Sequence, residues 1–165
     1  MRLVLIGAVL ALALAGCGKS GSSAPSNVDA CAMIAPSQDL FGANGEAQSI
    51  APLDAMAGVC HFRSADGRRG GDLIIYTAQS LHGSTAAAQF AHFTQSWAGM
   101  TTTPLARVAS VADEAQIATD LPGYQTQIVL RKGDQVAAIL AWSGDPAMTG
   151  EALARRMASA VAAKL

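Results

Sequence analysis

Apolar and polar residues alternate over residues 59–65, which is the pattern of a β-strand with one buried face, and residues 72–78 form a run rich in β-strand formers. Between them, residues 66–71 form a cluster of glycine and charged residues that is typical of a turn. We therefore expect the two segments to form an antiparallel hairpin. Within the first strand, the alternation places Cys60 on one face and His61 on the other.

A second pair of alternating segments covers residues 124–131 and 135–142, separated by the turn residues 132–134, and predicts another hairpin. The second segment of this pair is apolar on both faces. We expect it to lie centrally in a sheet, covered on both sides or nearly so. A short strand over residues 116–119 is expected just before this hairpin.

Two stretches instead show the period of an amphipathic helix. The first covers residues 85–97, with Ser84 as its expected N-cap. The second begins after the expected N-cap Thr149 and has Glu151 in its first turn, where a carboxylate complements the helix dipole. The expected buried stripes are Phe90, Phe93 and Trp97 in the first helix, and Leu153, Met157, Ala160, Val161 and Leu165 in the second.

The segment before the first hairpin carries weaker signals. Residues 28–34 suit a helical turn capped by Asp29, and a short helix is expected over residues 36–41, ended by Gly42. Residues 43–57 show little pattern and are interpreted as loop. The whole pattern predicts an α+β fold, in which two hairpin-then-helix segments build an antiparallel sheet with helices packed on it.

The chain begins with Arg2 and an unbroken apolar run over residues 3–15. This run is shorter than the roughly 20 residues that span a bilayer, and it has the dimensions of a signal-peptide core. It ends Leu-Ala-Gly-Cys at residues 14–17, which resembles the bacterial lipobox. The resemblance implies that residues 1–16 are a lipoprotein signal peptide and that Cys17 is acylated, for instance with palmitate. The alternative is an unmodified cysteine after an ordinary signal peptide.

Small and polar residues follow the cysteine. Residues 17–28 are therefore expected to be the lipidated cysteine and a flexible tether, with an end-to-end distance of about 18 Å. Gly18 stands where an aspartate would retain a lipoprotein in the inner membrane in enterobacterial-type sorting. We expect a single α+β domain over residues 29–165, held at the cell envelope facing the periplasm, at the outer membrane.

Charge gives little indication of a partner beyond that membrane. The 11 Lys and Arg residues nearly balance the 12 Asp and Glu residues, and without a basic patch nucleic acid is excluded. Arg68 and Arg69, at a predicted hairpin tip, are candidates for contact with an acidic partner or lipid headgroups, with solvated turn residues as the alternative. Trp142 is a candidate for the rim of a cleft, with core packing as the alternative.

Two cysteines remain besides the lipidated one, namely Cys31 and Cys60. In an oxidising envelope compartment, such a pair predicts a disulfide. Metal binding is the alternative, but the chain has no C-x-x-C motif and only His61 lies beside a cysteine. We therefore expect the disulfide and no metal site.

Signatures of catalysis are missing from the sequence. There is no G-x-S-x-G motif, and His61, His82 and His92 are widely spaced outside any metal-binding motif. Asp113 and Glu114 are the only adjacent carboxylates, and we expect them to cap a turn. The sequence thus predicts neither an enzyme nor a cofactor.

Several short motifs together resemble a known family. They are Asp29-x-Cys31-x-Met33-Ile34-x-Pro36, Gly42, Cys60-x-Phe62, Val111-Ala112-Asp113-Glu114-Ala115 and Arg131-Lys132-Gly133-Asp134-Gln135-Val136, followed by an alanine-rich C-terminal helix. This set resembles a family of small, cysteine-bridged bacterial lipoproteins of unknown function, common in actinobacteria. It is also similar in outline to the extracellular sensor domain of a mycobacterial serine/threonine kinase. The resemblance supports the disulfide and the α+β fold, and it transfers no catalytic residue.

These observations favour a non-enzymatic, membrane-anchored binding module for a periplasmic protein or small ligand. The alternatives are an immunity or inhibitor lipoprotein against an envelope-acting toxin, and a protein of envelope maintenance. An enzyme without a recognisable motif would need a pocket that brings His61 or His92 beside Asp113 or Glu114. A deep apolar cleft would favour a ligand, whereas a flat apolar patch would favour a protein partner.

Overall fold

The computed structural model describes residues 27–34, 38–122 and 125–165. The expected signal peptide, the lipidated Cys17 and the tether up to residue 26 lie outside the described residues. The same holds for Pro36, the expected start of a short helix, and for Tyr124, the expected start of a strand.

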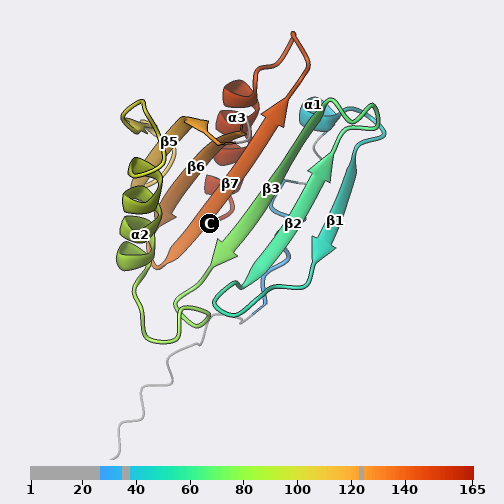
Figure 1. Cartoon of the computed structure of the whole chain (residues 1–165). Helices are drawn as coiled ribbons and strands as arrows, with labels where there is room; N and C mark the ends of the chain where they lie inside the picture. Colours follow the sequence, from blue (N-terminus) through green and yellow to red (C-terminus); the bar gives the residue numbers. More distant parts are fainter. Residues whose placement is uncertain (1–26, 35–37, 123–124) are drawn as a thin grey trace, which may run out of the picture.

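The described residues form one seven-stranded antiparallel sheet. The strand order is β1-β2-β3-β7-β6-β5-β4, so that the last of these strands in the chain occupies the centre (Figure 1). The predicted central position of this strand is therefore confirmed. The strands are β1 (Glu46–Ile50), β2 (Gly58–Arg63), β3 (Arg69–Tyr76), β4 (Ala106–Arg107), β5 (Glu114–Leu121), β6 (Gln125–Lys132) and β7 (Gln135–Ser143).

The described part of the chain adds three helices, α1 (Gln38–Phe41), α2 (Ala86–Ala98) and α3 (Gly150–Ala162), which confirms the α+β class. Helix α3 packs on β6 and β7 on one face of the sheet, while α2 packs over β5, β6 and β7 on the other face (Figure 1). On the α2 side, the area formed by β1, β2 and β3 therefore carries no helix within the described ranges.

The larger hydrophobic core lies between the sheet and α3. Leu153, Met157 and Val161 of α3 are completely buried against β-strand side chains, as the helical stripe predicted. Each side chain of this size contributes about 1.5–3 kcal/mol when it leaves water. Ala160 and Leu165, also expected in the stripe, are only partly buried.

The smaller core lies under α2. Phe90 and Trp97 are buried, and Phe93 packs at an edge-to-face angle on Tyr76 of β3, with ring centroids 5.7 Å apart. Burial under the helix raises the pKa of the Tyr76 phenol above its ordinary value. The predicted aromatic stripe is therefore core packing.

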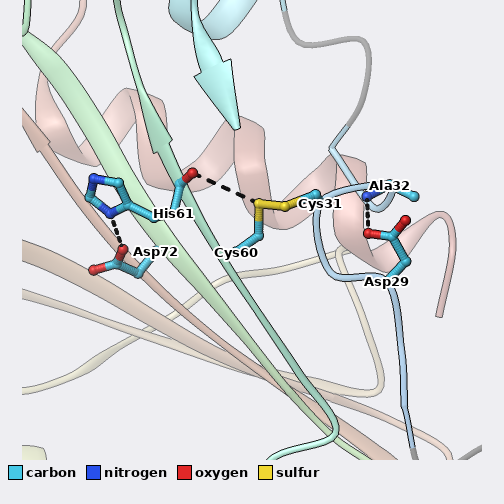
Figure 2. Close-up of a disulfide and its surroundings, with 6 residues drawn as sticks. All are labelled: Asp29, Cys31, Ala32, Cys60, His61 and Asp72. Atoms are coloured by element: carbon cyan, nitrogen blue, oxygen red, sulfur yellow. Dashed lines mark hydrogen bonds and ion pairs between the residues drawn. A yellow bond between two sulfur atoms is a disulfide. The ribbon is translucent and has the colours of Figure 1, made fainter. Parts of the chain in front are cut away.

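The N-terminal segment is bonded to β2 and to the residue that precedes this strand. A disulfide joins Cys31 to Cys60, with Cα atoms 5.0 Å apart, which confirms the predicted pairing (Figure 2). Val28 N–H donates to the carbonyl of Ala57 at 2.8 Å, and Asp29 caps the intervening turn as expected. Residues 27–165 thus contain the sheet, both cores and the disulfide, which are the features that an independently folding unit needs.

The interpretation of residues 43–57 as loop was wrong, because β1 lies within them. All five residues of β1 are exposed, so the strand has no buried face to produce an alternating pattern. Its place is determined by pairing along its whole length with β2.

Three further boundaries differ from the prediction. The N-cap of α2 is Thr85 rather than Ser84, because the Thr85 hydroxyl accepts from the Ala88 N–H at 3.1 Å. Strand β3 begins at Arg69, so the first hairpin turn is shorter than expected. Strands β1 and β4 extend the two expected strand pairs, so in the described chain three strands precede α2 and four lie between α2 and α3.

Candidate functional site

The open area of the sheet beside α2 carries two adjacent rows of side chains. The antiparallel register places Ile50, Val59 and Ile74 next to one another across β1, β2 and β3. Two residues further along β2, His61 lies opposite Asp72. Because residues two apart in a strand share a face, an apolar row and a polar row lie side by side.

A groove of about 320 Å³ lies over these rows, and we call it the apolar groove. Ile50 and Leu53 at its edge are 41% and 69% exposed, although side chains of this type are usually buried. The only other large apolar side chain with comparable exposure in the described residues is Met100, which does not line the groove. The lining residues are Ile50, Ala51, Leu53, Met56, Val59, His61, Asp72, Ile74 and Leu140.

His61 and Asp72 form a hydrogen-bonded pair in this lining. The distance from His61 Nδ1 to Asp72 Oδ1 is 2.6 Å, and the two side chains are 36% and 33% exposed. Figure 2 shows the pair on the opposite side of β2 from the disulfide. An ionised carboxylate only accepts hydrogen bonds, so Nδ1 carries the proton, and in the neutral imidazole Nε2 is an acceptor. Among the described residues, no other group hydrogen-bonds to this ring.

Trp142 lies beside the polar end of the groove. Its ring centroid is 5.8 Å from that of His61, and the two planes are tilted by 30°. Trp142 is paired with Gly70 in the register, and a Cβ atom on Gly70 would lie 2.0 Å from Trp142 Cζ2. The glycine therefore makes room for the indole ring. Trp142 packs on the backbone of β3 and against the ring of His61, and it is not itself among the lining residues of the groove.

The described lining of the groove carries a single carboxylate, that of Asp72, and no lysine or arginine. Arg63 is exposed in the next row of β2, and its guanidinium reaches towards Gly67 in the hairpin turn. Glu46 faces Arg63 across β1 and β2 in the register. The groove is thus apolar along most of its lining and anionic at one end.

The two arginines singled out from the sequence are separated by the structure. Arg68 is exposed in the turn, whereas Arg69 begins β3, is half-buried and has its Nε 3.6 Å from Asp145 Oδ2. The expectation that both lie at the hairpin tip was therefore wrong for Arg69. In the same turn, hydrogen bonds from the Ser64 hydroxyl and from the Arg68 N–H hold the pKa of Asp66 below its ordinary value. Neither arginine lines the apolar groove.

The adjacent carboxylates Asp113 and Glu114 serve the β6–β7 hairpin. Asp113 accepts the N–H of Gly133 in the hairpin turn at 2.8 Å, so its predicted turn-capping role is confirmed. Glu114 instead pairs with Arg131, whose Nε lies 2.6 Å from Glu114 Oε2. Neither carboxylate lines the apolar groove.

Of the three histidines considered from the sequence, the structure places only His61 in the apolar groove. His82 and His92 are exposed elsewhere. The carboxylate beside His61 is Asp72, which the sequence analysis did not single out. Within the described ranges, no three His, Cys, Asp or Glu side chains gather as metal ligands, and no helix has the length and apolar character needed to cross a membrane.

No family model, curated protein or solved structure matches the chain.

Proposed function

We propose that the protein is a lipid-anchored binding module of the bacterial cell envelope, and that the apolar groove is its ligand site. In this proposal Cys17 carries the acyl anchor, the tether follows it, and the domain faces the periplasm from the outer membrane. The observation that carries the proposal is the groove itself, with apolar side chains exposed over β1, β2 and β3, the area of this sheet face that no described helix covers.

The shape of the site favours a small ligand over a flat protein interface. Ligand pockets typically enclose about 300–1,000 Å³ and are mostly apolar, with a few polar groups that orient the ligand. At about 320 Å³ the groove is at the lower end of this range, and His61 and Asp72 provide its polar group. An immunity protein and an envelope-maintenance protein are weaker alternatives, because no described feature favours either.

The groove also gives a reason to test for catalysis. A histidine oriented by a carboxylate can act as a general base. The described lining contains no serine, threonine or cysteine beside it, so we propose binding rather than turnover. We further propose kinship with the small cysteine-bridged lipoproteins, which the confirmed disulfide and α+β class support.

The test is binding of N-phenyl-1-naphthylamine, a neutral apolar fluorophore, to the purified unit of residues 27–165. We expect saturable binding at one site. A Leu53→Asp substitution should weaken it about tenfold, which is about 1.4 kcal/mol, because it places a charge against the bound fluorophore. Leu53 is exposed, so the substitution leaves the core intact.

Met100→Asp is the matched control, since Met100 is 50% exposed and lies outside the groove. It should bind the fluorophore like the unchanged protein. Equal affinity in both variants, or no binding at all, would contradict the assignment of the site. Turnover of ester substrates that disappears in a His61→Phe variant would replace the binding role with an enzymatic one.

A further inference from the structure

We propose that the ligand of the apolar groove is a single-chain amphiphile with a non-anionic head that donates a hydrogen bond to His61 Nε2, a hydroxyl being the simplest example. The inference rests on the proposed function of the groove and names its ligand class. Four features of the groove support it.

The first feature is the distribution of polarity along the groove. The polar row contains His61 and Asp72, and the apolar row of Val59 and Ile74 lies two residues away along the same strands. Two residues of an antiparallel strand span about 7 Å. Beyond the apolar row, Leu53 belongs to the loop that joins β1 to β2, in which the exposed Asp54 follows it but does not line the groove. The lining therefore suits a molecule with one polar end and one apolar chain.

The second feature is the hydrogen-bonding state of His61. The carboxylate of Asp72 accepts the Nδ1 proton at 2.6 Å and thereby fixes which ring nitrogen carries it. The neutral ring then offers Nε2 only as an acceptor, and no described group occupies it. A ligand head must donate a hydrogen bond to satisfy this nitrogen.

The third feature is charge. Asp72 is the only carboxylate among the described lining residues, which include no lysine or arginine. An anionic head would be repelled by the carboxylate of Asp72. It would also lose its hydration on entering the groove, where no lysine or arginine of the lining could compensate for that loss. The groove should therefore discriminate against carboxylate and phosphate heads.

The fourth feature is the position of the apolar end of the groove, where the chain of the amphiphile would lie. Val28, where the described chain meets β2, donates its N–H to Ala57 at 2.8 Å, in the same β1–β2 connection that carries Leu53. Ten residues separate Val28 from Cys17, and they can span at most about 35 Å. The described chain therefore begins at the same end of β2 as the apolar end of the groove, on the opposite face of the sheet. A membrane amphiphile could enter head first with its chain trailing towards the bilayer.

The test compares 1-decanol with decanoate, which share a ten-carbon chain and differ in the head. Each compound is used to displace N-phenyl-1-naphthylamine from residues 27–165 at pH 8.5. The concentration of each competitor stays below the concentration at which that competitor aggregates. We expect decanol to bind at least tenfold more tightly than decanoate. Equal affinities, or tighter binding of decanoate, would overturn the inference about the ligand head. The proposal that the groove is a ligand site would be unaffected. Failure of the fluorophore itself to bind would instead overturn the proposed function.

An Asp72→Asn variant tests the orientation of the ring. An asparagine amide can donate to Nδ1, which moves the imidazole proton to Nε2 and makes that nitrogen a donor. We expect the ratio of decanol to decanoate affinity to fall at least tenfold. A His61→Phe variant keeps a ring but no acceptor, so it should weaken decanol and leave decanoate unchanged. An unchanged ratio in both variants would overturn the assignment of His61.

Discussion

Gly70 is the residue on which the position of Trp142 depends. The indole ring lies so close to the backbone of β3 that a methyl group on Gly70 would be 2.0 Å from Cζ2. The neighbouring ring of His61 is 5.8 Å from the indole, so any displacement of Trp142 also changes the surroundings of the histidine. A glycine inside a strand thus has a packing role here.

We expect Gly70→Ala to lower the free energy of unfolding by about 1–3 kcal/mol, because the tryptophan must leave its position. Urea denaturation measures the loss, and tryptophan fluorescence reports the movement. Gly144→Ala is the control, since its Cβ would meet only the Arg68 carbonyl at 3.9 Å. Equal stability of the two variants would show that Trp142 adapts without cost.

At the level of the elements, the sequence predicts well where side chains face a core. Strand β7 was predicted as a central strand because it is apolar on both faces, and helix α3 was predicted because its apolar side chains recur with the period of a helix. The edge strands β1 and β4 were missed because all of their residues are exposed. Their positions depend on pairing with a neighbouring strand, and this pairing leaves no pattern in the local sequence.

The His61–Asp72 pair was missed for a related reason. The sequence placed the first turn at residues 66–71, which would set residue 61 opposite residue 76. In the structure Ser64 and Arg69 close a shorter turn through the Ser64 N–H and the Arg69 carbonyl at 2.9 Å. His61 therefore faces Asp72. The type of each strand could be predicted, but the register that builds the site depends on the turn.

The disulfide connects two elements and should contribute strongly to stability. It closes a loop with a sequence separation of 29 residues, and chain entropy predicts about 3.5 kcal/mol from such a loop. Reduction of the unchanged protein should lower the free energy of unfolding by about this amount in guanidinium denaturation. A Cys31→Ala, Cys60→Ala variant should be equally stable with and without reductant. Sensitivity of that variant to the reductant would assign the effect to another cause.

For the whole molecule, the proposed anchor at Cys17 makes a direct prediction. Intact mass spectrometry of the natural protein should show a chain that begins at residue 17 and carries acyl mass on that residue. The mass should be missing from a Cys17→Ala variant. A natural protein with a free thiol at residue 17, or with a different mature N-terminus, would contradict the anchor and the placement of the groove near a membrane.

The central position of β7 has a consequence for the order in which this protein can be assembled. Strands β1 to β3 and β4 to β6 pair with each other only through β7, which spans Gln135–Ser143. In the envelope location proposed above, a chain that enters the periplasm from its N-terminus must wait until β7 has been translocated before its two half-sheets can join. During that interval β3 and β6 expose unpaired backbone to neighbouring chains. We therefore expect this protein to depend on a holding chaperone more strongly than a protein whose strands pair with their neighbours in the sequence.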